Sequence, residues 1–180
     1  MTAHRPPPPG KPAKGPDDKK HDKKHDPKHD AGKHLLRAHE HLGRLEVLQG
    51  ALGAAVPPSL ALLRAEAERY LSAGDAHSAA DLLRAAEHLG FAAAASKSPS
   101  ASVTPELEQA VQREFEKKVE KAREHLTAED SAIGKLALES LESARAALDE
   151  RHFRKALEFA RAAESLAGIE PHAESTPHKS

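Results

Sequence analysis

Apolar residues recur every three or four positions through most of the chain, which is the spacing of one face of an α-helix. No run has the alternating, β-branched character of a strand. The pattern therefore predicts an all-α fold of about six helices. The first, second and fourth helices are expected at 33–52, 59–73 and 105–126, and the third runs from the Asp75 cap to around 91–95. The fifth begins at Thr127 or Asp130 and ends at a turn near 150–151, after which the sixth continues to Gly168.

Proline, glycine and capping residues separate these helices. Pro57 and Pro58 break the chain and start the second helix, because proline is tolerated in a first helical turn. Gly74 supplies a left-handed stop, and Asp75 is a good N-cap for the third helix. The run Thr104-Pro105-Glu106 is a strong start for the fourth.

The predicted core is built from alanine and leucine, because only 3% of the residues are aromatic. Contacts between alanine-rich faces bury little area each, so a core of modest stability is expected. In the first and fourth helices the residues expected to face inward are Leu35, Ala38, Leu42, Leu45, Leu52, Leu107, Val111, Phe115, Val119, Ala122 and Leu126.

Two long stretches, 63–90 and 140–167, resemble each other when they are aligned without gaps at an offset of 77 positions. The alignment pairs Ala67 with Ala144 and Ala79 with Ala156, and the segment RAAE recurs at 84–87 and 161–164. We therefore expect two related three-helix halves, 33–95 and 105–168, joined by a Ser-rich linker at 96–104.

The terminal segments differ in composition from these halves. Residues 1–32 are rich in Pro, Lys, Asp and His and hold no apolar side chain larger than Ala after Met1, so a disordered arm is expected. Residues 169–180 are expected to form a flexible tail. The chain has no Cys and no apolar run long enough to span a membrane, and we expect a cytoplasmic protein.

The helix pair at 63–90 resembles a tetratricopeptide repeat (TPR). Ala67, Tyr70, Gly74, Ala79 and Ala86 occupy that family's small, aromatic and turn positions. In the later copy Ala144, Phe153, Ala156 and Ala163 fit, whereas Ala147 lacks the aromatic ring and Arg151 lacks the turn glycine. The resemblance implies a non-catalytic surface that holds partner proteins.

The later copy also resembles HEPN domains, small helical bundles of which many are ribonucleases. Their active motif has an Arg followed by a His after four to six residues, and Arg145 and His152 match it. The resemblance implies that His152 assists proton transfer and that Arg145 stabilises the developing phosphate charge. An exposed His at a helix start is the alternative interpretation.

The arm holds a histidine–aspartate repeat at His21, His25 and His29. Imidazole and carboxylate groups can ligate Zn²⁺ or Ni²⁺, so weak metal binding or buffering by the arm is one hypothesis. Pro27 prevents a helix from stacking the three histidines, and neighbouring lysines disfavour a cation. The alternative is a solvated arm, and no other cofactor is expected.

The hypothesis that we carry forward is a non-catalytic helical-repeat scaffold that mediates protein–protein interaction. Its partner is an unknown protein, and homo-oligomerisation is a further expectation because a repeat pair needs neighbours to bury its face. No membrane association is expected. Nucleic-acid binding is not expected either, because the arm lacks aromatic residues for base stacking and its Asp residues cancel over half its charge.

Overall fold

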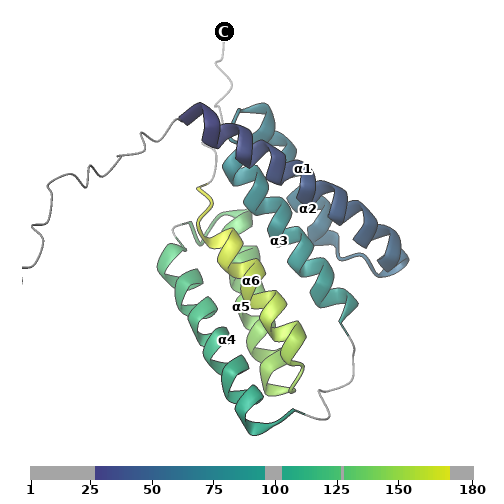
Figure 1. Ribbon diagram of the computed structural model, residues 1–180, viewed down its shortest axis with the longest axis vertical. Helices are drawn as coiled ribbons and strands as arrows, with labels where there is room; N and C mark the ends of the chain where they lie inside the picture. The colour runs from purple at the N-terminus through teal and green to yellow at the C-terminus, as the bar shows by residue number, and fades with distance from the viewer. Residues whose placement is uncertain (1–26, 96–102, 127, 171–180) are drawn as a thin grey trace, which may run out of the picture.

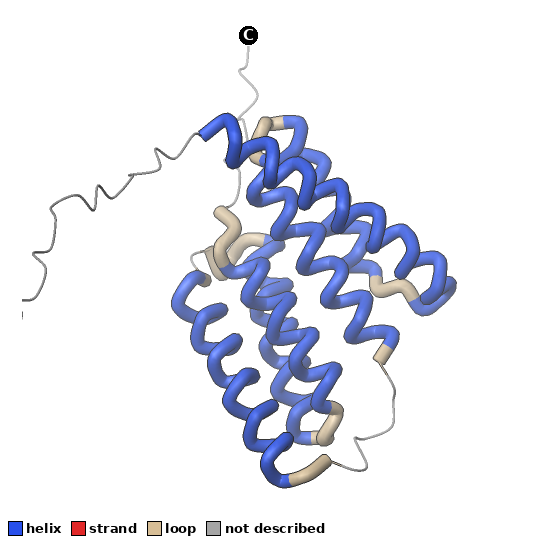
Figure 2. Tube along the Cα trace, viewed as in Figure 1, coloured by secondary structure: helices blue, strands red, loops and turns tan. Residues whose placement is uncertain are grey.

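The computed structural model describes residues 27–95, 103–126 and 128–170, and within these ranges the chain is helical and contains no strand (Figures 1 and 2). The predicted all-α fold of six helices is confirmed. The elements are α1 (Pro27–Leu52), a short 3-10 turn (Gly53–Ala55), α2 (Pro58–Ser72), α3 (Ala76–Ala94), α4 (Pro105–His125), α5 (Ala132–Asp149) and α6 (Phe153–Ala167).

The centre of the fold is the pair formed by α3 and α6. Helix α3 packs against α1, α2 and α6, and α6 packs against α3, α4 and α5. In Figure 1 the helices α1, α3, α6 and α4 lie in that order across the front of the molecule, with α2 and α5 behind them. Each half therefore contributes its third helix to the contact between the halves.

The two halves share one arrangement of helices. Helices α2 and α5 end at Ser72 and Asp149, and α3 and α6 begin at Ala76 and Phe153, so both pairs keep the offset of 77 positions. Helix α4 is the counterpart of α1 at the same offset. The buried α1 residues Ala38 and Leu45 correspond to Phe115 and Ala122, which are buried in α4.

The turn between the second and third helix is also the same in both halves. The Asp75 N–H donates to the Tyr70 carbonyl over 2.9 Å, and the His152 N–H donates to the Ala147 carbonyl over 2.8 Å. Gly74 has a φ of 84°. Arg151, at the corresponding position, has a φ of 60°, in a region that side chains with a Cβ rarely adopt. The turn that lacks its glycine therefore keeps the glycine conformation.

The largest apolar cluster joins the two halves. Leu45, Leu82 and Leu83 from the first half belong to the same cluster as Leu166 and Ile169 from the second. The Tyr70 hydroxyl, also from the first half, donates a hydrogen bond to the carbonyl of Glu170 over 2.5 Å.

Several predicted boundaries move in the structure. Helix α1 begins at Pro27 rather than Lys33, because proline fits a first helical turn. The Ser131 hydroxyl accepts a hydrogen bond from the Gly134 N–H over 2.9 Å and caps α5, which therefore starts later than Thr127 or Asp130. Ile169, assigned to the tail, is buried.

Two residues predicted to face inward are exposed. Leu35 is 44% exposed, because it is rotated by about 60° around α1 from the buried Ala38. Leu107 is 53% exposed in the first turn of α4, and the buried residues of that helix begin at Phe115. The remaining predictions for 1–26, for most of the linker and for 171–180 lie outside the described residues.

No helix within the described ranges combines the length and the apolar character that crossing a lipid bilayer would require.

Candidate binding grooves

The two residues of the HEPN-like motif lie on different elements. Arg145 is an exposed residue of α5 and lines a hollow between α4 and α5. His152 is the N-cap residue of α6, and its Nδ1 lies 3.1 Å from Glu150 Oε2. His152 is not among the residues that line that hollow. The ribonuclease hypothesis stays a prediction, tested by RNA cleavage with wild type, Arg145→Ala and His152→Ala.

The metal hypothesis rests on residues whose side chains lie outside the described part of the chain. His21 and His25 precede α1, and only the backbone of His29 is described, within α1. Among the described residues no group of three or more His, Asp or Glu side chains is placed to hold a metal ion.

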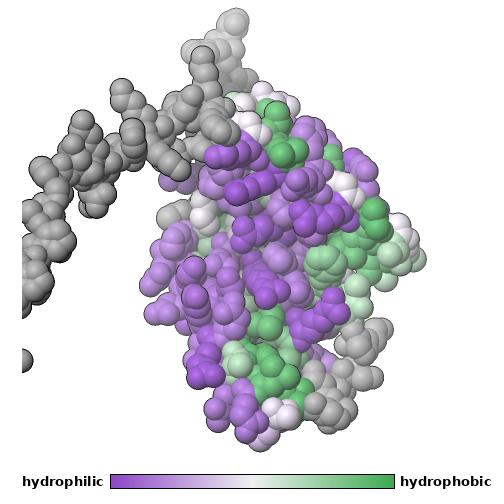
Figure 3. All heavy atoms as spheres, in the orientation of Figure 1, coloured by the Kyte–Doolittle hydropathy of each residue, from purple (hydrophilic) through white to green (hydrophobic). Residues whose placement is uncertain are grey.

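An apolar groove runs along α1 on its side facing Phe91 of α3. It encloses about 530 Å³ and follows α1 over three helical turns. Its lining combines Val47, Leu48, Ala51 and Phe91 with Gly43, and a polar rim of His39, Glu40 and Arg44. The apolar surface on the right of Figure 3 lies over the C-terminal end of α1, where this groove is found.

Val47 is the exposed centre of this groove. It is 76% exposed, the most exposed of the large apolar side chains in the described residues, and so adds little to the core. Gly43 lies one turn earlier, and a Cβ added there would meet no atom within 4 Å. The floor of the groove at Gly43 is therefore open backbone that another helix can approach closely.

The corresponding face of α4 is charged. Glu120 occupies the position of Gly43, Lys121 that of Arg44 and Glu124 that of Val47. Glu120, Lys121 and Glu124 are all exposed. The positions of Gly43 and Val47, which carry no charge in the first half, are thus occupied by glutamates in the second.

The second half has a different opening, between α4 and α5. Both helices pack on α6. The opening has two adjoining parts of about 410 and 400 Å³, which share Val119, Arg123 and Arg145. Leu126, Leu138 and Leu141 complete the apolar lining of the first part.

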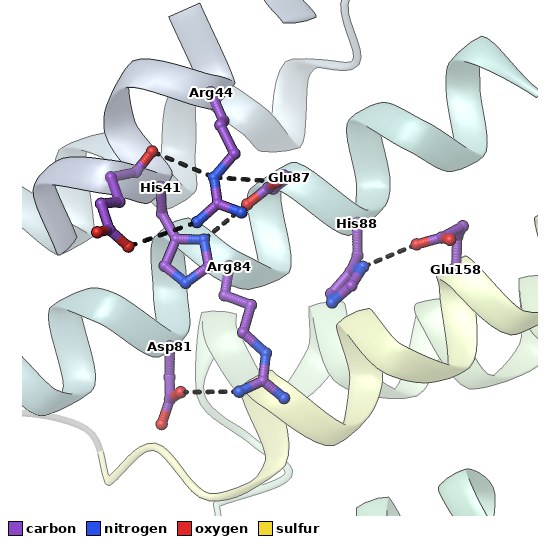
Figure 4. A network of polar contacts seen from close by, with 8 residues as sticks. His41, Arg44, Asp81, Arg84, Glu87, His88 and Glu158 are labelled. Atoms are coloured by element: carbon purple, nitrogen blue, oxygen red, sulfur yellow. Dashed lines mark hydrogen bonds and ion pairs between the residues drawn. The ribbon is translucent and has the colours of Figure 1, made fainter. Parts of the chain in front are cut away.

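Each half also holds one partly buried glutamate between two bases. In the first half His41 Nδ1 lies 2.6 Å from Glu87 Oε2, and Arg44 Nε lies 3.6 Å from Glu87 Oε1 (Figure 4). In the second half Lys118 and Lys121, the counterparts of His41 and Arg44, lie 2.8 and 3.5 Å from the oxygens of Glu164. The two clusters correspond residue by residue.

The electrostatic balance of the two clusters is the same. Burial raises the pKa of Glu87, but the hydrogen bond with His41 and the charge of Arg44 outweigh it, so that the pKa lies below its ordinary value. Burial likewise raises the pKa of Glu164, and Lys118 and Lys121 lower it further than burial raises it. Both glutamates are therefore held as carboxylates that tie the first helix of a half to its third.

A third polar pair crosses the contact between the halves. His88 of α3 has its Nδ1 2.7 Å from Glu158 Oε2 of α6, and Figure 4 shows the two side chains pointing toward each other. Arg161 Nη1 lies 3.2 Å from the other oxygen of Glu158. His88 therefore makes a side-chain contact between the halves.

Sequence reasoning missed both openings. Each depends on which helices touch, and the internal identity that revealed the duplication does not extend to α1 and α4. The two glutamate clusters did leave a signal in the sequence, since the pairs Arg44/Lys121 and Glu87/Glu164 keep the sign of their charge at the offset of 77 positions.

Comparison of this chain with models of known protein families, with curated protein sequences and with solved structures found no match.

Proposed function

We propose that this protein is a non-catalytic helical scaffold that binds a partner protein, and that the groove along α1 accepts a helix of that partner. The observation that supports this proposal is the exposure of Val47, whose corresponding residue in the second half is Glu124. The second half reaches the same helical arrangement with a glutamate at that position. The fold therefore does not require an apolar side chain there, whereas a binding surface does.

The dimensions of the groove suit a helix. Its lining repeats at intervals of three or four residues from His39 to Ala51, a length of about 18 Å at 1.5 Å per residue. An amphipathic helix binds such a groove by inserting apolar side chains from one face. Gly43 allows the two backbones to approach, and Val47 and Phe91 supply apolar surface.

The rim selects the charges of the partner. Glu40 and Arg44 are exposed and lie one turn apart on the same side of the groove, with 3.9 Å between Arg44 Nη2 and Glu40 Oε2. A partner helix with a base and an acid one turn apart would complement this pair. We therefore expect an amphipathic helix that carries both signs of charge beside its apolar face.

Site-specific photocrosslinking tests the proposal, with the duplication as an internal control. A photoreactive phenylalanine analogue replaces Val47 in one sample and Glu124 in the other, in the full-length protein. After illumination in native lysate, position 47 is expected to crosslink a defined peptide with an amphipathic helical pattern, and position 124, which lines the separate opening between α4 and α5, is not expected to crosslink that same peptide. The same products from both positions would contradict the proposal.

Two glycines then separate binding from folding. Gly43→Ala and Gly50→Ala both replace an α1 glycine where a Cβ has open space, and only Gly43 lines the groove. Both are expected to raise stability by up to about 1 kcal/mol. Only Gly43→Ala should weaken binding of the crosslinked peptide. Equal affinity of the two variants would count against a helix in the groove.

A further inference from the structure

The opening between α4 and α5 carries two arginines without a partner. Arg123 of α4 and Arg145 of α5 line both of its parts. Within the described ranges neither guanidinium group forms an ion pair or a hydrogen bond. Glu129 and Glu142 line the same opening without pairing with them.

The first half shows what the same positions do when they are paired. Glu46 and Glu68 are the counterparts of Arg123 and Arg145, and Arg64 is the counterpart of Leu141. Arg64 Nη2 lies 3.4 Å from Glu46 Oε1, and Arg64 Nε lies 3.4 Å from Glu68 Oε1. A central base thus joins two acids and bridges α1 to α2.

The second half inverts this arrangement and leaves it incomplete. Two bases, Arg123 and Arg145, take the places of the two acids, and the central charge is replaced by the half-buried Leu141. Within the part of the chain that the structure describes, no acid pairs with either arginine. We propose that a partner peptide supplies it, so that the α4–α5 opening is a second binding site, for an Asp or Glu carboxylate next to an apolar side chain.

The chemistry of the lining supports this ligand. Arginine presents several N–H donors in a plane and binds carboxylates through paired hydrogen bonds. Leu141 lines the opening together with the two arginines, and Val119 and Leu138 add to its apolar lining. The ligand therefore combines one negative group with an adjoining apolar body.

The surrounding charge argues for a peptide and against a polyanion. Besides the two arginines, the two parts of the opening are lined by Glu116, Glu120, Glu124, Glu129 and Glu142. This acidic rim repels a chain of phosphates, whose binding depends on neutralisation by bases. It favours a peptide in which lysines flank the single acid. The inference does not depend on the groove along α1.

The test uses two synthetic helical peptides of about 14 residues. The first carries one central Glu between leucines on one face and lysines on the other, and its twin has Gln in place of that Glu. Binding to full-length protein is measured by fluorescence anisotropy, in wild type and in Val47→Glu, which removes the apolar centre of the α1 groove. The Glu peptide is expected to bind about tenfold more tightly than its twin to both proteins.

A charge exchange sharpens the test. The double variant R123E/R145E copies the charges of Glu46 and Glu68. It should prefer a third peptide with Arg at the centre, because Arg64 pairs with those two glutamates in the first half. Arg123 and Arg145 are exposed and unpaired in the described structure, so these changes leave the core intact, which circular dichroism checks. The single variant Arg145→Gln should lose about tenfold for the Glu peptide only.

Three results would overturn the inference. The first is equal affinity of wild type for the Glu and Gln peptides. The second is the same peptide preference in R123E/R145E as in wild type. The third is displacement of the Glu peptide by single-stranded RNA or by inorganic phosphate at lower concentration than by unlabelled peptide. Cleavage of that RNA, lost in Arg145→Gln and in His152→Ala, would assign Arg145 to the ribonuclease hypothesis instead.

Discussion

The two halves of this protein have one backbone and two different surfaces. Their helices end and begin at corresponding residues, and both use a glutamate, Glu87 or Glu164, to tie the first helix to the third. Where α1 is apolar at Val47, α4 has Glu124. Where α1 and α2 are bridged by Arg64, α4 and α5 present Leu141 and two arginines that pair with no other described residue. Positions that the halves share specify the fold, and positions at which they differ are free to specify binding.

The comparison also separates the first helices by intrinsic stability. Helix α1 contains Gly32, Gly43 and Gly50, and each costs about 1 kcal/mol relative to alanine in a helix interior. Helix α4 contains no glycine and carries acids in its first turn and bases in its last, which complement the helix dipole. Helix α1 therefore depends more on its packing against α3 than α4 depends on its packing against α6.

The largest effect is expected where the halves start their second helix differently. The first half uses Pro57 and Pro58, whereas the second uses the Ser131 cap followed by Gly134. A Cβ at Gly134 would overlap the carbonyl oxygen of Ala128, which is backbone and cannot rotate away. Gly134→Ala should therefore destabilise the protein by about 3 kcal/mol.

Urea unfolding of Gly134→Ala measures this loss, with Gly50→Ala as the control, because open space surrounds Gly50 and the substitution there should stabilise. A Gly134→Ala variant as stable as wild type would show that the close contact between Gly134 and Ala128 is not part of the fold.

The next effect compares the two glutamate clusters. Glu87→Gln should cost about 2 kcal/mol and Glu164→Gln about 1 kcal/mol, because the Glu87 side chain is 8% exposed and that of Glu164 is 17% exposed. Chemical denaturation of the two variants and of wild type at neutral pH measures both losses of stability. Unchanged stability in both variants would show that these clusters do not stabilise the packing of the first helix of each half.

Acid should reduce the same two contributions. The pKa values of Glu87 and Glu164 in the folded protein lie below the ordinary value of 4.5, so each stabilises the fold fully above pH 4.5 and ceases to do so as the pH falls through its folded pKa. Between pH 7 and pH 3, wild type should lose about 1 kcal/mol more than the double variant E87Q/E164Q. Equal losses would contradict this linkage.

The smallest effect is expected in the repeated turn. Gly74→Ala places a Cβ at a φ of 84° and should cost about 1 kcal/mol. Arg151→Gly relieves the same conformation, but it also removes two hydrogen bonds of 3.0 Å to Glu108. In a Glu108→Ala background, which leaves no side-chain acceptor for Arg151 at that position, Arg151→Gly should therefore stabilise by about 0.5 kcal/mol. Thermal unfolding of the single and double variants separates the two terms, and a loss in both backgrounds would contradict the conformational argument.

Local chemistry made the helices predictable, and contacts between helices made the grooves unpredictable. Pro58, Gly74 and Pro105 mark ends that the structure confirms within a residue or so, because capping and turn preferences act on the neighbouring backbone. Leu35 and Val47 are both apolar residues of α1, and no rule of spacing states that the packing of α3 on α1 leaves both of them exposed. The role of Arg123 required knowing that α4 and α5 flank one opening.

The affinity of the crosslinked partner peptide for wild type and for Val47→Glu tests the central claim most directly. The substitution copies the residue that the second half has at this position and leaves the core untouched, so the melting temperature should not change. The peptide should bind at least about tenfold more weakly to Val47→Glu, the loss expected when a buried valine contact is removed. The same affinity for both proteins would show that the groove along α1 is not where this protein binds its partner.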